Sequence, residues 1–365
     1  LAQYHRTYQG MRVHVFDQEQ IFNEFSSGTP SAIAYRRLAK MFYDRNTSRF
    51  KYLLFYGASS YDNRGVILDR KDNLVTYQCE TKNDANDETR SYCSDAFFGM
   101  LSDDYSQSTI HYTYMDINVS RIPASNEQEA TNINEKTLEY LLNPPANSSR
   151  NRALLLCDNG DFNSHLLQTE AVCDTIQKLA PHVTLTKSYC TLYPWTVAND
   201  AVEGRRVTKN ALAAGQQFFF YTGHGKPESL ATEVLWNQNY VEETNYDVHP
   251  ITYLATCNAL SFDRGSNIGE TMLYKRTGGS IAVISSGRTV YRDCNQVLSI
   301  GLADALYSAQ QGETIGDMYR KARNSAIKFA VDSAERVYGI NTLCFNMIGD
   351  PALPLSVPTH KVKIN

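Results

Sequence analysis

The chain has 365 residues, of which 42% are hydrophobic and 20% are charged, and its formal net charge is −4 at pH 7. This is the composition of a globular protein, and the length is sufficient for two packed units. The slight negative charge, with Lys and Arg dispersed along the chain, excludes an electrostatic basis for nucleic-acid binding.

Eight cysteines are widely spaced and form no CxxC pair. Their spacing excludes a zinc ribbon and a dense disulfide scaffold. Cys79 and Cys93 flank an acidic polar loop and could close one disulfide. No signal peptide or apolar run of transmembrane length is present. Because the first residues do not resemble an initiation region, we expect the chain to be a piece of a longer secreted protein.

The first part of the chain holds few regular segments, separated by long polar stretches. Thr29 and Pro30 are a plausible cap and first-turn pair for its first helix. In chain order, the expected elements are a helix over 31–43, strands over 52–56 and 117–122, and a helix over 127–142. A cluster of Pro, Asn and Ser follows, which is typical of a boundary. We place the division near Asn147, which predicts domains over 1–147 and 148–365.

After this boundary, strands and helices alternate. The expected strands cover 153–157, 183–189, 218–222, 251–256 and 280–286. Apolar residues repeat on one face of the intervening helices, as Val172 and Ile176 do in one helix and Leu298 and Leu302 in another. This alternation predicts an α/β sandwich with a mostly parallel sheet. Functional groups collect beyond the carboxyl ends of the strands in that architecture.

Two of these strands end at residues capable of nucleophilic chemistry. One leads into Gly223-His224-Gly225 and the next leads into Cys257. If both strands lie in one parallel sheet, the imidazole and the thiol emerge at the same edge. The histidine can then accept the thiol proton and leave the nucleophilic thiolate. The amide N–H groups of Gly225 and Cys257 could stabilise a developing oxyanion.

Each of these features has a simpler interpretation. A lone cysteine at a strand end is usually a small buried hydrophobe, and a lone histidine in a Gly-rich turn is more often structural. The nearest additional metal ligands are His249 and Cys294, whose spacing matches no zinc pattern, so we expect no metal. Asp158 or Asp161, after a third strand, could orient the imidazole, or Asp161 could cap the following helix. His165 is expected on the surface of that helix.

Several motifs together resemble peptidase family C25, the gingipain-type cysteine peptidases. They are YTGHG at 221–225, the Cys257-Asn258 pair, GGSIAVISS at 278–286 and FNMIGDP at 345–351. The resemblance implies a caspase-like fold in which a smaller amino-terminal subdomain packs beside a larger catalytic one. It also implies that Cys257 is the nucleophile and His224 the base, that Asp158 or Asp161 is the orienting acid, and that Gly225 with Cys257 forms the oxyanion hole.

The same resemblance indicates where substrate specificity would arise. The strand ending at Ser286 would help to wall the specificity pocket, and Tyr291 and Arg292 would continue that wall. Arginine-specific members of the family keep an acidic residue at the start of a helix that corresponds here to residues 164–167. This chain has no acid there. Arginine specificity is therefore not expected.

The amino-terminal half is similar to the sortase branch of the family, which belongs to the type IX secretion system of Bacteroidetes. The similar segments are 21–44, 51–65, 93–104 and 116–130. The resemblance implies a transpeptidase at the cell surface, associated with the outer membrane through an anchoring protein. It would remove the carboxy-terminal secretion signal of cargo proteins and join the cargo to an anionic lipopolysaccharide. The alternatives are an endopeptidase that only hydrolyses and a non-catalytic caspase-like interaction module.

No cofactor is expected, since the chain has neither a GxGxxG motif nor a Walker loop. Structural calcium is the one addition that the resemblance suggests, because related peptidases bind it. The acidic stretches at 84–88 and 103–104 could contribute oxygen ligands, although an acidic solvated loop is the simpler interpretation.

Overall fold

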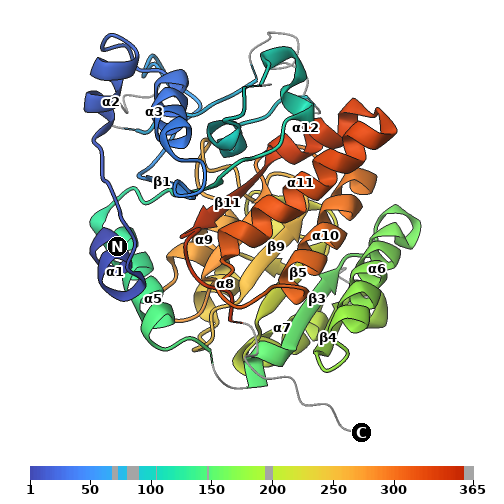
Figure 1. The fold of residues 1–365 in the computed structure, drawn as a ribbon. Helices are drawn as coiled ribbons and strands as arrows, with labels where there is room; N and C mark the ends of the chain where they lie inside the picture. The colour runs from blue at the N-terminus through green and yellow to red at the C-terminus, as the bar shows by residue number, and fades with distance from the viewer. Residues whose placement is uncertain (68–72, 80–89, 104, 146–147, 194–199, 357–365) are drawn as a thin grey trace, which may run out of the picture.

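The computed structural model describes residues 1–67, 73–79, 90–103, 105–145, 148–193 and 200–356. Their main feature is an eight-stranded sheet with helices on both faces (Figure 1). The strand order is β1-β2-β11-β10-β9-β5-β3-β4, and every neighbouring pair is parallel except β10 with β11. The predicted α/β sandwich with a mostly parallel sheet is confirmed.

The strands of this sheet are β1 (Tyr52–Tyr56), β2 (Asn118–Ile122), β3 (Arg152–Cys157), β4 (Thr184–Tyr189), β5 (Phe218–Thr222), β9 (Ile251–Ala255), β10 (Ala282–Ser286) and β11 (Phe345–Gly349). A second, small sheet contains β6 (Gly225–Lys226), β7 (Ser229–Leu230) and β8 (Trp236–Asn237). The α-helices are α1 (Ala2–Gln9), α2 (Gln18–Phe25), α3 (Ala32–Arg45), α5 (Glu127–Leu142), α6 (Ser164–Leu179), α7 (Val202–Ala213), α8 (Gln238–Glu243), α9 (Ile268–Tyr274), α10 (Arg292–Tyr307), α11 (Ile315–Ser333) and α12 (Arg336–Cys344).

The alternation of side chains along each strand explains why helices cover both faces. In β3, Leu155 and Cys157 belong to one apolar cluster with α6, α10 and α11. Leu154 and Leu156 belong to a second cluster with α7, α8 and α9. Successive residues of a strand point to opposite faces, so a strand buried on both sides is rich in apolar residues on both. The run FFFYT of β5, in which every residue is buried and the first four are aromatic, shows this pattern.

Most predicted element positions agree with the structure, but the predicted cap of the first long helix is wrong. Helix α3 begins one residue after Ser31, whose hydroxyl accepts the backbone N–H of Ile33 at 3.3 Å. Thr29 and Pro30 therefore lie before the helix. A serine side chain at the cap position satisfies an N–H group that the first turn leaves unpaired.

Strands from both sides of the division predicted near Asn147 lie in the same sheet. Strands β1 and β2 come from the first part of the chain, and β11, near the end, lies between β2 and β10. The contact between β11 and β2 pairs Ile348 with Arg121. The division into domains 1–147 and 148–365 stays a prediction.

The disulfide considered for Cys79 and Cys93 is not formed, and both thiols are free. In the bridge between their two segments, the residue opposite Cys93 is Gln78. Because neighbouring residues of an extended segment point to opposite sides, Cys79 faces away from Cys93. Burial raises the pKa of Cys93, which keeps it as a neutral thiol.

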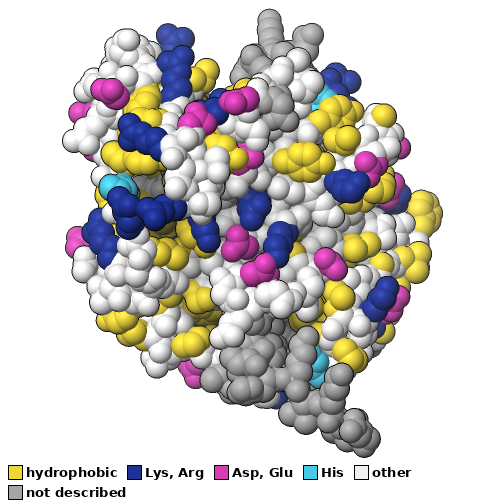
Figure 2. Space-filling model, in the orientation of Figure 1, with side chains coloured by type: hydrophobic (Ala, Val, Ile, Leu, Met, Phe, Trp, Pro, Cys, Tyr) yellow, Lys and Arg dark blue, Asp and Glu magenta, His cyan; other side chains and the backbone are white. Residues whose placement is uncertain are grey.

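Basic side chains on the face shown in Figure 2 are interspersed with acidic and apolar ones. Within the described parts of the chain, no helix combines the length and the apolar character needed to cross a membrane.

A buried ion pair fixes the amino-terminal part of the chain against the sheet. Arg121 of β2 is fully buried and forms a bidentate pair with Asp95, with N–O distances of 2.9 Å and 2.6 Å. The rings of Phe55 and Phe262 lie 4.8 Å and 5.0 Å from the guanidinium carbon. Since Phe55 and Phe262 come from opposite halves of the chain, this guanidinium joins the two halves.

The substitution Asp95→Asn should lower the free energy of unfolding by about 3–5 kcal/mol, because it leaves a buried guanidinium without its counter-charge. Urea denaturation followed by circular dichroism measures this change. Asp332→Asn on α11 is the matched control, since it breaks an exposed pair with Lys328 and should leave stability nearly unchanged. Equal losses in the two variants would show that Arg121 does not depend on Asp95.

Candidate active site

The register of three neighbouring parallel strands brings the predicted catalytic residues to one edge of the sheet. Thr222 of β5 pairs with Ala255 of β9 and with Cys157 of β3. His224 and Cys257 each lie two residues beyond a member of this row, and Asp158 lies one residue beyond. Neighbouring strands are about 4.8 Å apart, so the three chain segments leave the sheet side by side.

The thiol of Cys257 lies against the backbone of Val290. The Val290 N–H donates to Sγ at 3.4 Å, and the thiol donates to the Val290 carbonyl at 3.7 Å. Burial raises the pKa of Cys257, and the bond to the Val290 backbone opposes this effect only in part. The resting group is therefore a thiol that needs a base. The sequence offered no sign of Val290, because its contribution comes from the backbone.

A buried scaffold holds the loop that carries the thiol. Arg288 and Asp263 form a bidentate pair at 2.9 Å and 2.5 Å, and the Arg288 carbonyl accepts the N–H of Asn258 at 3.3 Å. The Ser286 hydroxyl donates to the Thr256 carbonyl at 2.6 Å. Ser286 is fully buried, so the structure places it beneath the site and not on the wall of a substrate pocket. Its binding role was implied by the resemblance of segment 278–286 to the strand that helps to wall the specificity pocket of the family.

The imidazole of His224 is about half exposed and lies beside the loop that follows β3. Its Nε2 is 3.5 Å from Oδ1 of Asp161. A Cβ atom on Gly160 would lie 2.8 Å from the ring carbon Cδ2, so this position needs glycine for the ring to fit. Among the described residues, no hydrogen bond joins the imidazole to the Cys257 thiol. Catalytic hydrogen bonds of free enzymes are often long and tighten when substrate binds.

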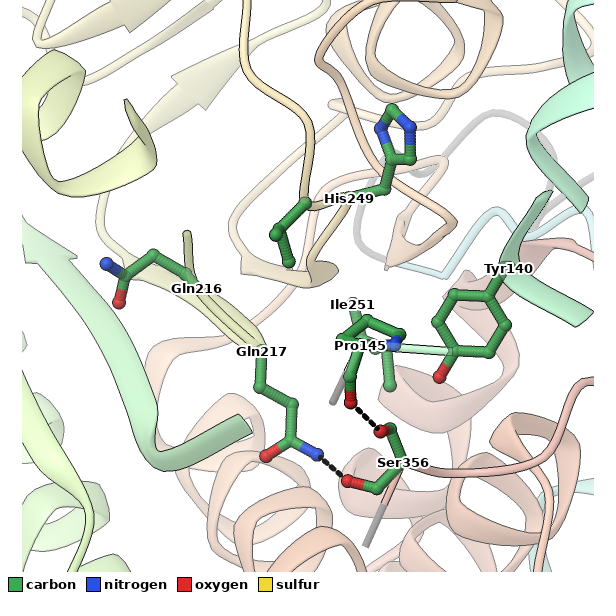
Figure 3. Close-up of a pocket in the computed structure, with 8 residues that line it drawn as sticks. Tyr140, Pro145, Gln216, Gln217, His249, Ile251 and Ser356 are labelled. Carbon is green, nitrogen blue, oxygen red and sulfur yellow. Dashed lines mark hydrogen bonds between the residues drawn. The ribbon is translucent and has the colours of Figure 1, made fainter. Parts of the chain in front are cut away.

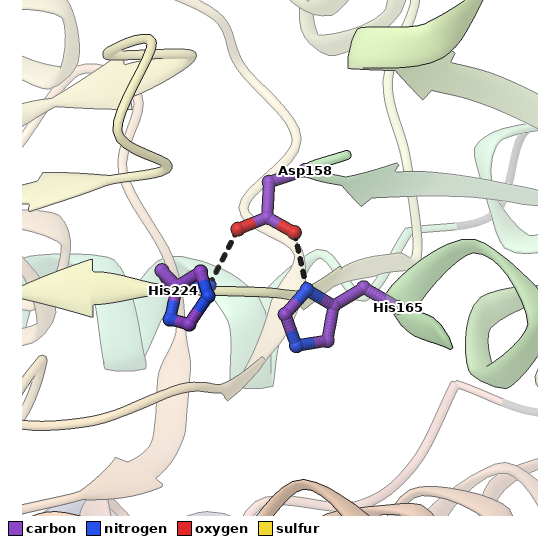
Figure 4. A group of neighbouring side chains, drawn as sticks. All are labelled: Asp158, His165 and His224. Carbon is purple, nitrogen blue, oxygen red and sulfur yellow. Dashed lines mark hydrogen bonds and ion pairs between the residues drawn. The ribbon is translucent and has the colours of Figure 1, made fainter. Parts of the chain in front are cut away.

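The two candidate acids have different positions around the histidine. Asp158 is buried, and its Oδ2 accepts the backbone N–H of His224 at 2.7 Å. Its Oδ1 bonds to Nδ1 of His165 (Figure 4). Contacts of the described residues place Asp161, and not Asp158, against the His224 imidazole. Asp158 therefore holds the chain segment that carries the ring, while Asp161 faces the ring.

The prediction that His165 lies on the surface of its helix is wrong. The residue is in the first turn of α6 and only 4% of it is exposed. Its Nε2 is 3.6 Å from Oδ2 of Asp161, and its ring centroid is 5.1 Å from that of His224. The helix starts directly over the end of β3, and this placement turns its first residues toward the site. Periodicity alone does not reveal such a turn.

Two residues predicted to wall the substrate pocket border the site. Tyr291 follows Val290, is 45% exposed, and donates its N–H to Oδ1 of Asn341 at 2.8 Å. A guanidinium nitrogen of Arg292 is 3.8 Å from Oδ2 of Asp161 and 3.1 Å from the Ser164 hydroxyl. The carboxylate of Asp161 thus has two imidazoles and one guanidinium around it.

The predicted oxyanion donors have the required freedom. The His224 carbonyl accepts the N–H of Ala231 at 2.9 Å, which makes the next opposed pair, Gly225 with Leu230, a non-hydrogen-bonded pair. The Gly225 N–H therefore points away from β7. Among the described residues, no acceptor is bonded to the Cys257 N–H. A Cβ on Gly225 would overlap the Thr256 hydroxyl, so the backbone can approach this closely only as glycine.

The other sites considered from the sequence lie elsewhere. His249 is partly buried at the opposite edge of the sheet, and its Nδ1 bonds to the Gly278 carbonyl at 2.8 Å. It lines a small pocket near Gln217 and Ile251, at the amino ends of β5 and β9 (Figure 3). Cys294 is buried in α10. This pocket is therefore separated from Cys257 by the length of the strands.

The acidic stretches considered for calcium add no ligand cluster among the described residues. Residues 84–88 and Asp104 lie outside the described parts of the chain. Asp103 accepts a hydrogen bond from Lys40 at 2.7 Å. Calcium binding stays a prediction.

Comparison with known proteins identifies a family that this chain matches. The model of "Peptidase family C25" matches residues 1–356. The Arg-specific cysteine proteinase gingipain R has a similar structure, with 16% identity, a TM-score of 0.71, and coverage of 96% of this chain and 73% of that chain. Dimeric latent PorU from Porphyromonas gingivalis has 22% identity and a TM-score of 0.51, and the match covers 99% of this chain and 29% of that one. The curated protein sequences contain no match.

The raised pKa of Cys257 predicts how its alkylation will depend on pH. A neutral reagent such as iodoacetamide reacts with the thiolate, so the rate at Cys257 should rise about tenfold per pH unit from pH 6 to pH 8. Peptide mapping by mass spectrometry separates Cys257 from the other cysteines, and Cys257→Ser identifies the peptide. A rate that is flat over this range would instead indicate a thiolate already paired with imidazolium.

Proposed function

The chain belongs to peptidase family C25, and from that premise we propose that it is a cysteine transpeptidase in which Cys257 is the nucleophile and His224 the general base. One observation carries this proposal. His224 and Cys257 lie two residues beyond paired positions of the adjacent parallel strands β5 and β9. The functional residues of a parallel sheet collect at such an edge.

The proposed reaction begins when Sγ of Cys257 attacks the carbonyl carbon of the scissile peptide bond and His224 accepts the thiol proton. The carbonyl oxygen becomes an oxyanion, and the N–H groups of Gly225 and Cys257 stabilise it. The C–N bond then breaks, and His224 returns the proton to the leaving amine. The thioester that remains is attacked by an incoming amine or by water, which restores the thiol.

We assign Asp161 and Asp158 different roles in this reaction. Asp161 faces the imidazole and would stabilise the imidazolium that forms when the thiol loses its proton. Asp158 acts through the backbone of His224 and is a positioning residue. Tyr291 and Arg292 directly follow Val290, whose backbone contacts the Cys257 thiol, and they would contact the substrate.

The finer proposal is that of a sortase of the type IX secretion system. Its support is the resemblance of the amino-terminal segments to that branch, together with the absence of an acid from the first turn of α6. Its substrates would be cargo proteins with a carboxy-terminal secretion signal, and its acceptor an amine on anionic lipopolysaccharide. We further propose a cell-surface location at the outer membrane, held there by an anchoring protein. Hydrolysis alone is the alternative outcome of the same thioester.

A mixing experiment tests this proposal. Purified enzyme, a cargo protein with its secretion signal and a small primary amine should give cargo whose new carboxyl end carries the amine, detected by mass spectrometry. Cargo ending only in a free carboxylate would remove the transpeptidase activity and leave a peptidase. The same mixture with Cys257→Ala should give neither product. Cleavage that persists in Cys257→Ala would contradict the assignment of the nucleophile.

The contact between Gly160 and the imidazole gives a second prediction. The φ of Gly160 is −66°, so alanine fits its backbone, and only the ring of His224 obstructs the added methyl group. Gly160→Ala should displace the ring and lower kcat by about a hundredfold, because misplacement of a catalytic group by 1 Å has an effect of this size. Steady-state kinetics with a peptide substrate measures it. An unchanged urea midpoint would confirm that the fold is intact, whereas an unchanged kcat would contradict the placement of the ring.

A further inference from the structure

The strongest unexplained feature of the described residues is a second histidine beside the catalytic one. Asp158, His165 and His224 each offer a ligand atom, and these atoms all lie within 4.8 Å of one another. The proposed reaction uses only one imidazole. His165 has no part in it, although it is 96% buried and is oriented by a buried carboxylate (Figure 4).

The orientation of His165 is that of a metal-binding histidine. Its Nδ1 bonds to Oδ1 of Asp158, so this nitrogen carries the ring proton when the imidazole is neutral. The lone pair is then on Nε2, which faces Asp161. Histidine ligands of zinc almost always donate their other N–H to a carboxylate or carbonyl in this way.

The distances around Asp161 also fit a metal. Its two oxygens lie 3.5 Å from Nε2 of His224 and 3.6 Å from Nε2 of His165. Both separations are longer than a good hydrogen bond. Ligand atoms of a tetrahedral zinc ion, bound at about 2.0–2.2 Å, are roughly 3.4 Å apart. The two rings are nearly perpendicular, with an interplanar angle of 85°, and the Nε2 atom of each ring lies beside one oxygen of the Asp161 carboxylate.

We propose that His165, His224 and Asp161 form a zinc-binding site that reversibly inhibits the enzyme, with Asp158 holding His165 in the ligating orientation. Two imidazoles and one carboxylate suit Zn²⁺, whereas Ca²⁺ and Mg²⁺ require more oxygen ligands. A metal on Nε2 of His224 leaves the ring proton on Nδ1, so neither nitrogen of the imidazole can accept the thiol proton. The inhibitory consequence rests on the proposed function, but metal binding does not.

The metal-binding arm of the test uses the full chain with Cys257→Ala, which removes the reactive thiol as a ligand and does not require activity. Zn²⁺ is titrated against a chromogenic chelator, and one ion per chain should bind at this site. Adding His165→Asn should weaken Zn²⁺ binding about a hundredfold or more, because it removes a ligand. Loss of a residue that only hydrogen-bonds to a ligand already lowers metal affinity about 10–100-fold. Asparagine keeps an N–H for Asp158, so the fold should persist. His182→Asn, at an exposed position before β4, is the matched control and should bind as the parent does.

The inhibition arm uses the chain with Cys257 intact. Each variant's rate in Zn²⁺ is compared with its own rate in chelator. The parent should lose activity in Zn²⁺ and recover it on chelation, His165→Asn should need about a hundredfold more Zn²⁺ for the same loss, and Ca²⁺ should have no effect.

Three results would overturn the inference. The first is equal Zn²⁺ affinity with and without His165→Asn. The second is binding that Cys257→Ala abolishes and His165→Asn preserves, which would place the ion on the thiol. The third is binding that depends on His165 but leaves the rate unchanged, which would separate the ion from the catalytic imidazole. If the chain has no peptidase activity at all, the proposed function fails while the first arm still decides the metal site.

Discussion

The register between β3, β5 and β9 is the constraint on which the rest of the structure depends. Parallel pairing of Cys157, Thr222 and Ala255 in one row fixes where three chain segments leave the sheet. A slip of one residue would exchange the two faces of a strand, and both faces here are buried against helices. The apolar packing of the sheet therefore also determines the alignment of the segments that carry Asp158, His224 and Cys257.

Buried polar groups hold the aligned chain segments in fixed positions at the candidate site. The Arg288–Asp263 pair holds the loop after Cys257, and the Asp158 carboxylate holds the backbone of His224. These groups are removed from water and each forms hydrogen bonds with several partners, which restricts it to one favourable position. The exposed groups, Asp161 and the His224 ring, are free to change partners during a reaction. The buried groups of the site are thus fixed, and its exposed groups can move.

The sequence predicted the sheet, and the placement of His224 and Cys257 at one edge of it, because both depend on short-range patterns. Apolar runs located β5 and β9, and His224 and Cys257 were selected as candidates because they follow these strands. The contribution of Val290 could not be predicted, because any residue supplies the same backbone groups. The burial of His165 was missed for a related reason. Burial at a strand end depends on where the next helix begins in space, and periodicity carries no such information.

Asp161 lies beside several of the charged and titratable groups of the candidate site. Its carboxylate lies within 3.8 Å of His224, His165 and Arg292, and it is itself exposed. The separations of 3.5 Å, 3.6 Å and 3.8 Å are all longer than a good hydrogen bond, so Asp161 is held closely by none of the three groups and can move toward one of them. If Arg292 holds it, the imidazole of His224 loses the group that would stabilise its charged form. If His224 holds it, Arg292 is released toward the space beside Val290, where a substrate would lie. Catalysis at this edge then depends on which neighbour Asp161 binds, and a substrate or an ion that changes the choice changes the state of the site.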